Sequence, residues 1–169
     1  MESPQEAAYR GTEPAPDALE TLHAATRVLA GVALRSLDVL GGAVTLPQFR
    51  ILAVLADRGQ AGPAQVARAL GVEASAVTRF ADRMVAAGYV SRDDEPGHRD
   101  AAILELSSPG EDLVGRVTAR REQELARILS QLPLAERTIL THALSQFVKA
   151  AGEGYGAVSV TPVRPGSGG

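Results

Sequence analysis

The chain has 169 residues, a net charge of −3 and no cysteine. This length allows one domain with a hydrophobic core, and the absence of cysteine excludes disulfides, cysteine metal sites and thiol redox sensing. No apolar run approaches the roughly 20 residues that span a bilayer and no cleavable leader is recognisable, so we expect a soluble, cytoplasmic protein without a membrane partner.

The first part of the chain predicts a tail followed by two helices. Residues 1–16 are polar, contain three prolines and show no periodicity, and are predicted to be disordered. Apolar residues at helical spacing predict a helix over 17–40. A second helix is predicted to begin at Thr45, because Thr45 and Gln48 have the spacing of a capping box.

Residues 62–107 predict two short helices around a tight turn. The first helix is predicted over 63–70 and ends at Gly71, since glycine enters the left-handed conformation without a steric clash. The second helix is predicted over 74–87, and its apolar residues share one face: Val77, Phe80, Ala81, Met84 and Val85. The opposite face carries Ser75, Thr78, Arg79 and Asp82.

A β-hairpin is predicted directly after the second helix. Tyr89 and Val90 begin one strand, and alternating apolar residues over 102–106 indicate another, with a charged tip between them. Two short helices with polar donors on the outward face of the second are typical of DNA-reading proteins, because an α-helix fits the major groove. A helical domain can contain such a pair without binding DNA, but a hairpin in this position adds a second groove contact and favours DNA binding.

The charge of residues 62–107 does not by itself indicate DNA binding. Five arginines stand against seven acidic residues, which gives a net charge of −2. DNA binding therefore depends on where individual arginines point, and Arg79 and Arg83 on the second helix are the candidates.

The C-terminal part predicts two more helices, over 108–131 and 134–151, before a Gly- and Pro-rich tail at 152–169. Ser108 and Glu111 have capping-box spacing. The apolar stripes at 17–40 and 108–151 exceed what one small domain can cover, so we expect them to pair with a second copy in a homodimer. Packing within the monomer is the alternative.

The chain resembles the MarR family of bacterial transcription regulators. The resemblance runs from about residue 17 to 152, and its best segments are TLPQFRILAVLADRG, PAQVARALGVEASAVTRFADRMVAAGYVSR and HRDAAILELSSPGEDL. No single motif is specific, whereas the order and spacing of all three are. The resemblance implies a mainly α fold with a small β-hairpin wing, in which a winged helix–turn–helix at 45–107 is flanked by dimerisation helices at 17–40 and 108–151.

The resemblance also assigns roles to residues of the winged helix–turn–helix. It implies that the helix at 74–87 enters the major groove and that the wing enters the minor groove. Ser75, Thr78 and Arg79 match the helix positions that approach bases and phosphates, and Arg99 matches the family's wing arginine. The tip here reads His98-Arg99-Asp100 instead of Asp-Arg-Arg, which leaves open whether it binds the minor groove as in the family.

The function implied by the resemblance is sequence-specific binding of double-stranded DNA. We expect a homodimeric repressor on a pseudo-palindromic operator, released by a small-molecule effector of the anionic aromatic kind. Candidate effector contacts are His23, Arg27, Arg50, Arg116 and Arg121, and the alternative for each is a solvated or ion-paired surface residue. The alternative is a winged-helix dimer that binds only proteins. An enzyme is not expected, because no nucleophile, phosphate-loop or metal motif is present, and no cofactor or metal is expected either.

Overall fold

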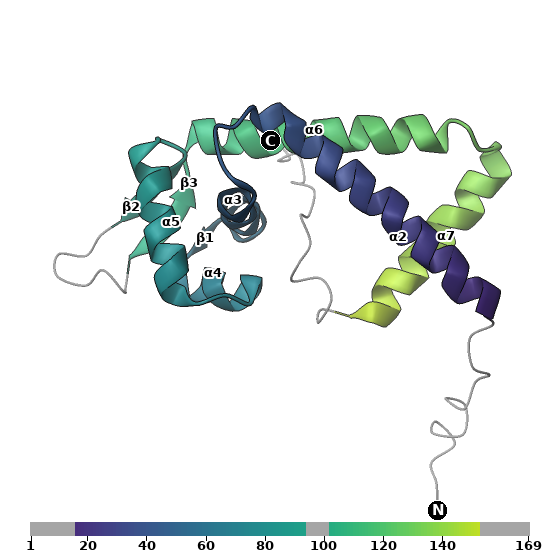
Figure 1. The fold of residues 1–169 in the computed structure, drawn as a ribbon, viewed down its shortest axis with the longest axis horizontal. Coiled ribbons are helices and arrows are strands. Elements are labelled where there is room, and N and C mark those ends of the chain that lie inside the picture. Colours follow the sequence, from purple (N-terminus) through teal and green to yellow (C-terminus); the bar gives the residue numbers. More distant parts are fainter. Residues whose placement is uncertain (1–15, 94–101, 153–169) are drawn as a thin grey trace, which may run out of the picture. The chain divides into compact units, whose positions relative to one another are not determined.

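The computed structural model describes residues 16–93 and 102–152. The tails expected at 1–16 and 152–169 lie outside these ranges, apart from their innermost residues. The described chain is mainly helical with one small antiparallel sheet, which confirms the predicted fold class. In chain order the elements are α2 (Pro16–Ser36), η1 (Leu37–Leu40), α3 (Leu46–Arg58), β1 (Gln60–Ala61), α4 (Pro63–Leu70), α5 (Ala74–Ala86), β2 (Val90–Asp93), β3 (Ile103–Leu106), α6 (Ser108–Leu129) and α7 (Leu134–Ala151) (Figure 1).

Residues 1–35 and 36–169 form two compact units, and the described part of the first lies entirely within α2. The sequence predicts one helix as far as Leu40, whereas α2 ends at Ser36 and a 3₁₀ helix follows. Tighter 3₁₀ turns are frequent at helix C-termini. Large apolar side chains of α2 are exposed: Leu19, Leu22, Val28, Leu29 and Leu34. No described helix combines the length and the sustained apolar character that crossing a membrane requires.

α3 is the central helix of the second unit. Its Phe49, Leu52 and Leu55 are completely buried, and it contacts α4, α5, α6, β1 and β3. The predicted cap forms, since the Gln48 Oε1 atom accepts a hydrogen bond of 2.8 Å from the backbone N–H of Thr45. This cap fixes where α3 begins, and the elements packed on α3 form the hydrophobic core of the second unit.

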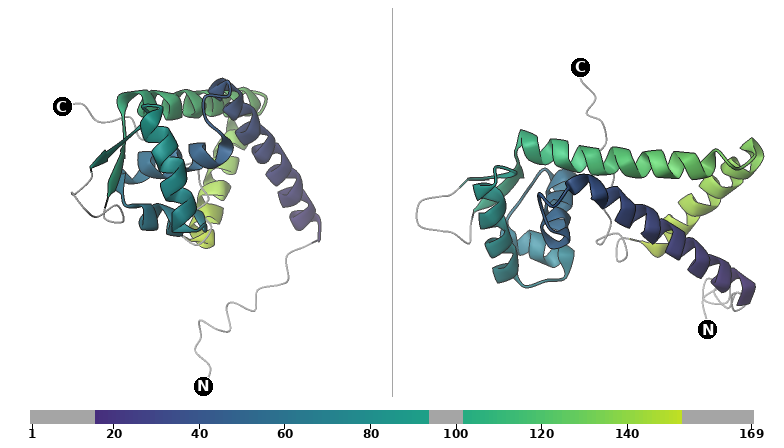
Figure 2. Two further views of the ribbon diagram at one scale, coloured as in Figure 1. Left: turned by 60° about the vertical axis from the view of Figure 1, so that its left-hand side comes forward. Right: turned by 45° about the horizontal axis from the view of Figure 1, so that its top comes forward.

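The sheet has three strands in the order β1-β3-β2, all antiparallel. The hairpin of β2 and β3 is the predicted wing, with Val90 opposite Leu106 and Asp93 opposite Ile103. The two-residue strand β1 pairs with β3 and was not predicted. Both views of Figure 2 show α5 alongside these strands, and α5 contacts β2. The wing is therefore attached to the helix that precedes it.

α6 is a long uninterrupted helix, and the chain turns at Pro133 into α7 (Figures 1 and 2). The predicted capping box of Ser108 and Glu111 is wrong, because the N-cap is Ser107, one residue earlier. The Ser107 Oγ atom accepts a hydrogen bond of 3.3 Å from the N–H of Gly110 and donates one of 2.5 Å to the carbonyl of Gly88. The N-cap thus ties the start of α6 to the end of α5.

Candidate nucleic-acid interface

Residues that favour helix ends mark the boundaries of α4 and the turn that leads to α5. Gly62 is the N-cap of α4, and its N–H donates to the Gln65 Oε1 atom at 3.0 Å. Gly71 ends α4 with a φ of 65°, a conformation that other residues adopt only with strain. α5 then begins at Ala74 with Glu73 as an N-cap that forms no side-chain hydrogen bond. The result is a pair of short helices, α4 and α5, joined by a tight turn.

The two faces of α5 separate as the sequence predicts. Val77, Ala81 and Met84 are buried in the core, and this burial holds the helix in one rotational setting. Ser75 and Arg79 are exposed on the other face. Thr78 is half-buried, and its Oγ1 atom donates to the Ala74 carbonyl at 3.1 Å. The hydroxyl of Thr78 therefore has an intrahelical partner when no ligand is bound.

The arginines of α5 are available for an anion. Arg79 and Arg83 are exposed, and neither forms an ion pair within the described residues. The guanidinium carbon of Arg79 lies 5.9 Å from the centroid of the Phe80 ring. An aromatic ring at this distance attracts a cation weakly, so it can orient the guanidinium without neutralising it. An outward, unpaired arginine is the group that binds phosphate or guanine with two hydrogen bonds.

One acidic residue on α5 is neutralised by the wing. The Asp82 Oδ1 atom lies 2.6 Å from the Nη1 atom of Arg92 on β2. The Arg92 side chain is 13% exposed, so its charge is held against the protein. Glu73 remains exposed near the N-terminal end of α5, where a carboxylate would repel an approaching phosphate. Of these two acids, Asp82 is paired with Arg92, and Glu73 forms no ion pair within the described residues.

The predicted wing-tip residues His98, Arg99 and Asp100 lie outside the described residues. The described strands β2 and β3 pair up to Asp93 and Ile103, and β2 contacts α5. Contact of the tip with a minor groove remains a prediction.

The five predicted effector contacts have different environments. His23 and Arg27 are exposed on α2, and Arg116 is exposed on α6. Arg50 and Arg121 are half-buried and already donate hydrogen bonds of 3.3 Å, to the Leu70 carbonyl and to the Ser36 Oγ atom. Burial also lowers the pKa of the Arg121 guanidinium through desolvation.

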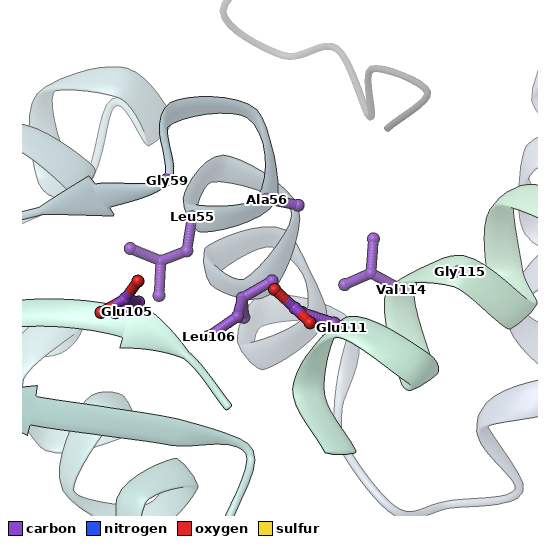
Figure 3. Close-up of a pocket in the computed structure, with 8 residues that line it drawn as sticks. All are labelled: Leu55, Ala56, Gly59, Glu105, Leu106, Glu111, Val114 and Gly115. Carbon is purple, nitrogen blue, oxygen red and sulfur yellow. The ribbon is translucent and has the colours of Figure 1, made fainter. Parts of the chain in front are cut away.

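Two features near this surface were not predicted from the sequence. One is the Asp82–Arg92 ion pair, and the other is a cavity of about 300 Å³ between α3, β3 and α6 (Figure 3). Each involves residues from different elements, so no local spacing signals it. The two-residue period of a strand, which places Arg92 on the same face as the buried Val90, is the sequence signal that could have indicated its position.

Comparison with known proteins identifies relatives of this chain. A family model described as MarR family matches residues 44–100. The chain is 30% identical over 118 residues to the HTH-type transcriptional repressor MdtR of Bacillus subtilis, covering 70% of this chain and 75% of MdtR. It is 31% identical over 105 residues to the HTH-type transcriptional regulator PecS of Dickeya dadantii, covering 60% of this chain and 63% of PecS.

A solved structure agrees with the fold. The crystal structure of RV1404 from Mycobacterium tuberculosis superposes with a TM-score of 0.73 at 36% sequence identity, covering 83% of this chain and 97% of that one. The similarity therefore includes helices on both sides of the winged helix–turn–helix segment.

Proposed function

Because the chain belongs to the MarR family of winged-helix transcription regulators, which bind DNA and are not enzymes, we propose that it is a homodimeric repressor. In this proposal two copies bind a pseudo-palindromic operator, and a small-molecule effector releases them. The name of its relative MdtR, a transcriptional repressor, supports repression as the mode of control.

The observation that carries the proposal is the outward face of α5. Ser75, Arg79 and Arg83 are exposed there, while Val77 and Met84 fix the opposite face in the core. A helix held in this way presents its donors in one orientation, which sequence-specific reading of base edges requires. We assign Arg79 to a base edge or a phosphate, and Ser75, Thr78 and Arg83 to contacts beside it.

The wing supplies a second contact in this proposal. Arg99 at the tip would enter the minor groove, where a narrow A·T-rich segment attracts arginine. His98 would stand beside it in place of the family's aspartate. The Asp82–Arg92 pair supports this arrangement, since it ties β2 to α5 and thereby fixes the base of the wing relative to the reading helix.

The proposed dimer is supported by large apolar side chains that are exposed to solvent in a single copy. No residue of α7 is buried, and Leu134 and Phe147 are 77% and 55% exposed. Large apolar residues of α2 are exposed as well. Exposed apolar side chains of this kind on a helix mark an interaction site, and two-fold pairing of terminal helices would cover them while presenting two copies of α5.

The proposed effector is an anionic aromatic compound. Arg116 is exposed and forms no ion pair within the described residues, so its charge is available to an anionic ligand. His23 and Arg27 are exposed in the same way, whereas Arg50 and Arg121 would have to exchange internal acceptors for the ligand. Such a ligand controls DNA binding only if it binds two arrangements of the dimer with different affinity.

The test is a titration of the purified protein into labelled DNA from upstream of its own coding region, at two salt concentrations. We expect saturable binding that weakens steeply with salt, because arginine–phosphate contacts release counterions. Binding to this DNA no tighter than to a scrambled duplex would contradict the proposal. It would favour the alternative, a winged-helix dimer that binds only proteins, with which the acidic balance of residues 62–107 agrees.

A further inference from the structure

The side chain of Ser107 joins the end of α5 to the start of α6. Its Oγ atom donates a hydrogen bond of 2.5 Å to the carbonyl of Gly88, in the turn that follows α5. The same atom accepts a hydrogen bond of 3.3 Å from the N–H of Gly110, in the first turn of α6. One hydroxyl group therefore serves both elements, as a donor to one and as an acceptor for the other.

Two backbone contacts accompany these hydrogen bonds. The N–H of Ser107 donates to the Tyr89 carbonyl at 3.1 Å. The oxygen of that carbonyl lies against Gly110, where an added Cβ atom would approach it to 2.1 Å. Glycine at this position thus allows α6 to begin directly against the chain that leaves α5. We refer to Ser107, Gly110, Gly88 and Tyr89 together as the Ser107 joint.

The helix α6 connects this joint to the part of the chain proposed to form the dimer. Its Leu113, Val114 and Val117 are buried in the hydrophobic core of the second unit, and none of the described residues after Val117 belongs to that core. The helix runs for 22 residues without interruption, which corresponds to about 33 Å. A displacement of its far end is therefore carried along a continuous helix to the Ser107 joint.

The angle between α5 and α6 depends on this joint. Burial of Val77, Ala81 and Met84 fixes the rotation of α5 about its own axis. However, α5 packs against α3, α4 and β2 and not along α6. The helix α3 contacts both α5 and α6 and so links them indirectly, whereas the hydrogen bond from Ser107 to Gly88 is a direct link between their ends.

From these observations we infer that Ser107 is a positioning residue for DNA binding. Its hydroxyl group fixes the angle between α5 and α6, and thereby the separation of the two α5 helices in the dimer, without touching DNA. A fixed separation makes binding depend strictly on the spacing of the operator half-sites, because each α5 must reach its own groove. This inference rests on the proposed function, and it names the contact through which a movement of α6 reaches α5.

Three substitutions in the full-length protein separate the joint from the helix cap. Ser107→Asp keeps an oxygen that accepts from the Gly110 N–H and suits the N-terminus of α6, but it cannot donate to the Gly88 carbonyl. Ser107→Thr keeps both functions of the hydroxyl group. Ser108→Ala is the matched control, since Ser108 is exposed and its side chain forms no hydrogen bond within the described residues. Thermal denaturation shows whether each variant is folded under the conditions of the binding experiment.

The first readout is the preference for half-site spacing. Fluorescence anisotropy compares the DNA from upstream of the coding region with the same DNA carrying one extra base pair between the half-sites. We expect the wild type, Ser107→Thr and Ser108→Ala to prefer the native spacing by about tenfold. Ser107→Asp should bind the native spacing about two- to fivefold more weakly and lose most of this preference. An undiminished preference in Ser107→Asp, or equal behaviour of Ser107→Asp and Ser107→Thr, would overturn the inference.

The second readout contains no DNA. The amide of residue 107 donates to the Tyr89 carbonyl, so its protection from hydrogen exchange, measured by NMR, reports whether the joint is closed. This protection should fall about fivefold in Ser107→Asp and stay unchanged in Ser107→Thr. Equal protection in the wild type and Ser107→Asp would overturn the inference even if the wild type binds DNA. A wild type without any preference among DNA sequences would instead contradict the proposed function, so the two failures are distinguishable.

Discussion

The Nη1 atom of Arg92 lies 2.6 Å from the Oδ1 atom of Asp82, and this ion pair joins the wing strand β2 to the helix α5. The arginine is largely covered, whereas the Asp82 side chain is 55% exposed. A partly covered charge depends more on its partner than an exposed one does, because water compensates it less. The two parts proposed to touch DNA are therefore linked by an interaction within the protein.

Removing Arg92 should destabilise the protein more than neutralising Asp82. Arg92→Ala removes both the charge and a side chain packed against the protein, and should lower the free energy of unfolding by about 2 kcal/mol. Asp82→Asn keeps the size of the side chain and should cost about 1 kcal/mol or less. Urea denaturation measures both values. Equal stability of both variants and the wild type would show that the pair does not hold β2 against α5.

Substitution by alanine should change stability in opposite directions at two glycines of α6. A Cβ on Gly110 would lie 2.1 Å from the Tyr89 carbonyl oxygen, so Gly110→Ala forces the start of α6 away from β2. We expect a loss of about 1–3 kcal/mol. Gly115 has open space around it, and Gly115→Ala should add about 0.5–1 kcal/mol through helix propensity. Thermal denaturation of the pair separates these effects, and a stable Gly110→Ala variant would contradict the close approach.

The substitution Arg79→Ala tests the reading face of α5. Losing a bidentate base contact should weaken operator binding by about 1–3 kcal/mol, while stability stays the same because the side chain is exposed. Arg58→Ala is the matched control, since it removes the same charge from an exposed position in the last turn of α3. Equal affinities of the two variants, measured by fluorescence anisotropy, would exclude Arg79 from the interface.

Charges placed on α7 test the proposed dimer. Phe147 is exposed in one copy, and Phe147→Glu should prevent its burial between two copies, because an unpaired buried carboxylate is strongly unfavourable. We expect a monomer in sedimentation experiments and a large loss of operator affinity. Lys149→Glu also adds negative charge on the exposed surface of α7 and serves as the comparison. A dimer that persists in Phe147→Glu would remove α7 from the proposed interface.

The sequence predicted the helices well where one strong local signal marked each boundary. The predicted helix over 63–70 agrees with α4 because Pro63 and Gly71 mark both of its ends. The start of α6 was misplaced by one residue, since Ser107 and Ser108 are both good N-caps. The contact of Ser107 with the distant carbonyl of Gly88 decides between them, and local spacing cannot show such a contact.

Features that form between segments far apart in the sequence were not predicted. The strand β1 has two residues, too few to show alternation, and exists because β3 pairs with it. The cavity between α3, β3 and α6 depends on how three elements pack, although each of its residues is unremarkable alone. The exposed residues of α5 were predictable, because helical periodicity alone places Ser75 and Arg79 opposite Val77 and Met84.

The central claim is that two copies of the α5 reading face act together on one DNA site. Hydroxyl-radical footprinting of the upstream DNA measures this most directly. The account predicts two protected regions related by two-fold symmetry, with centres about one helical turn (~34–36 Å) apart, and their loss with Arg79→Ala. A single protected region, or a footprint that Arg79→Ala leaves unchanged, would contradict it.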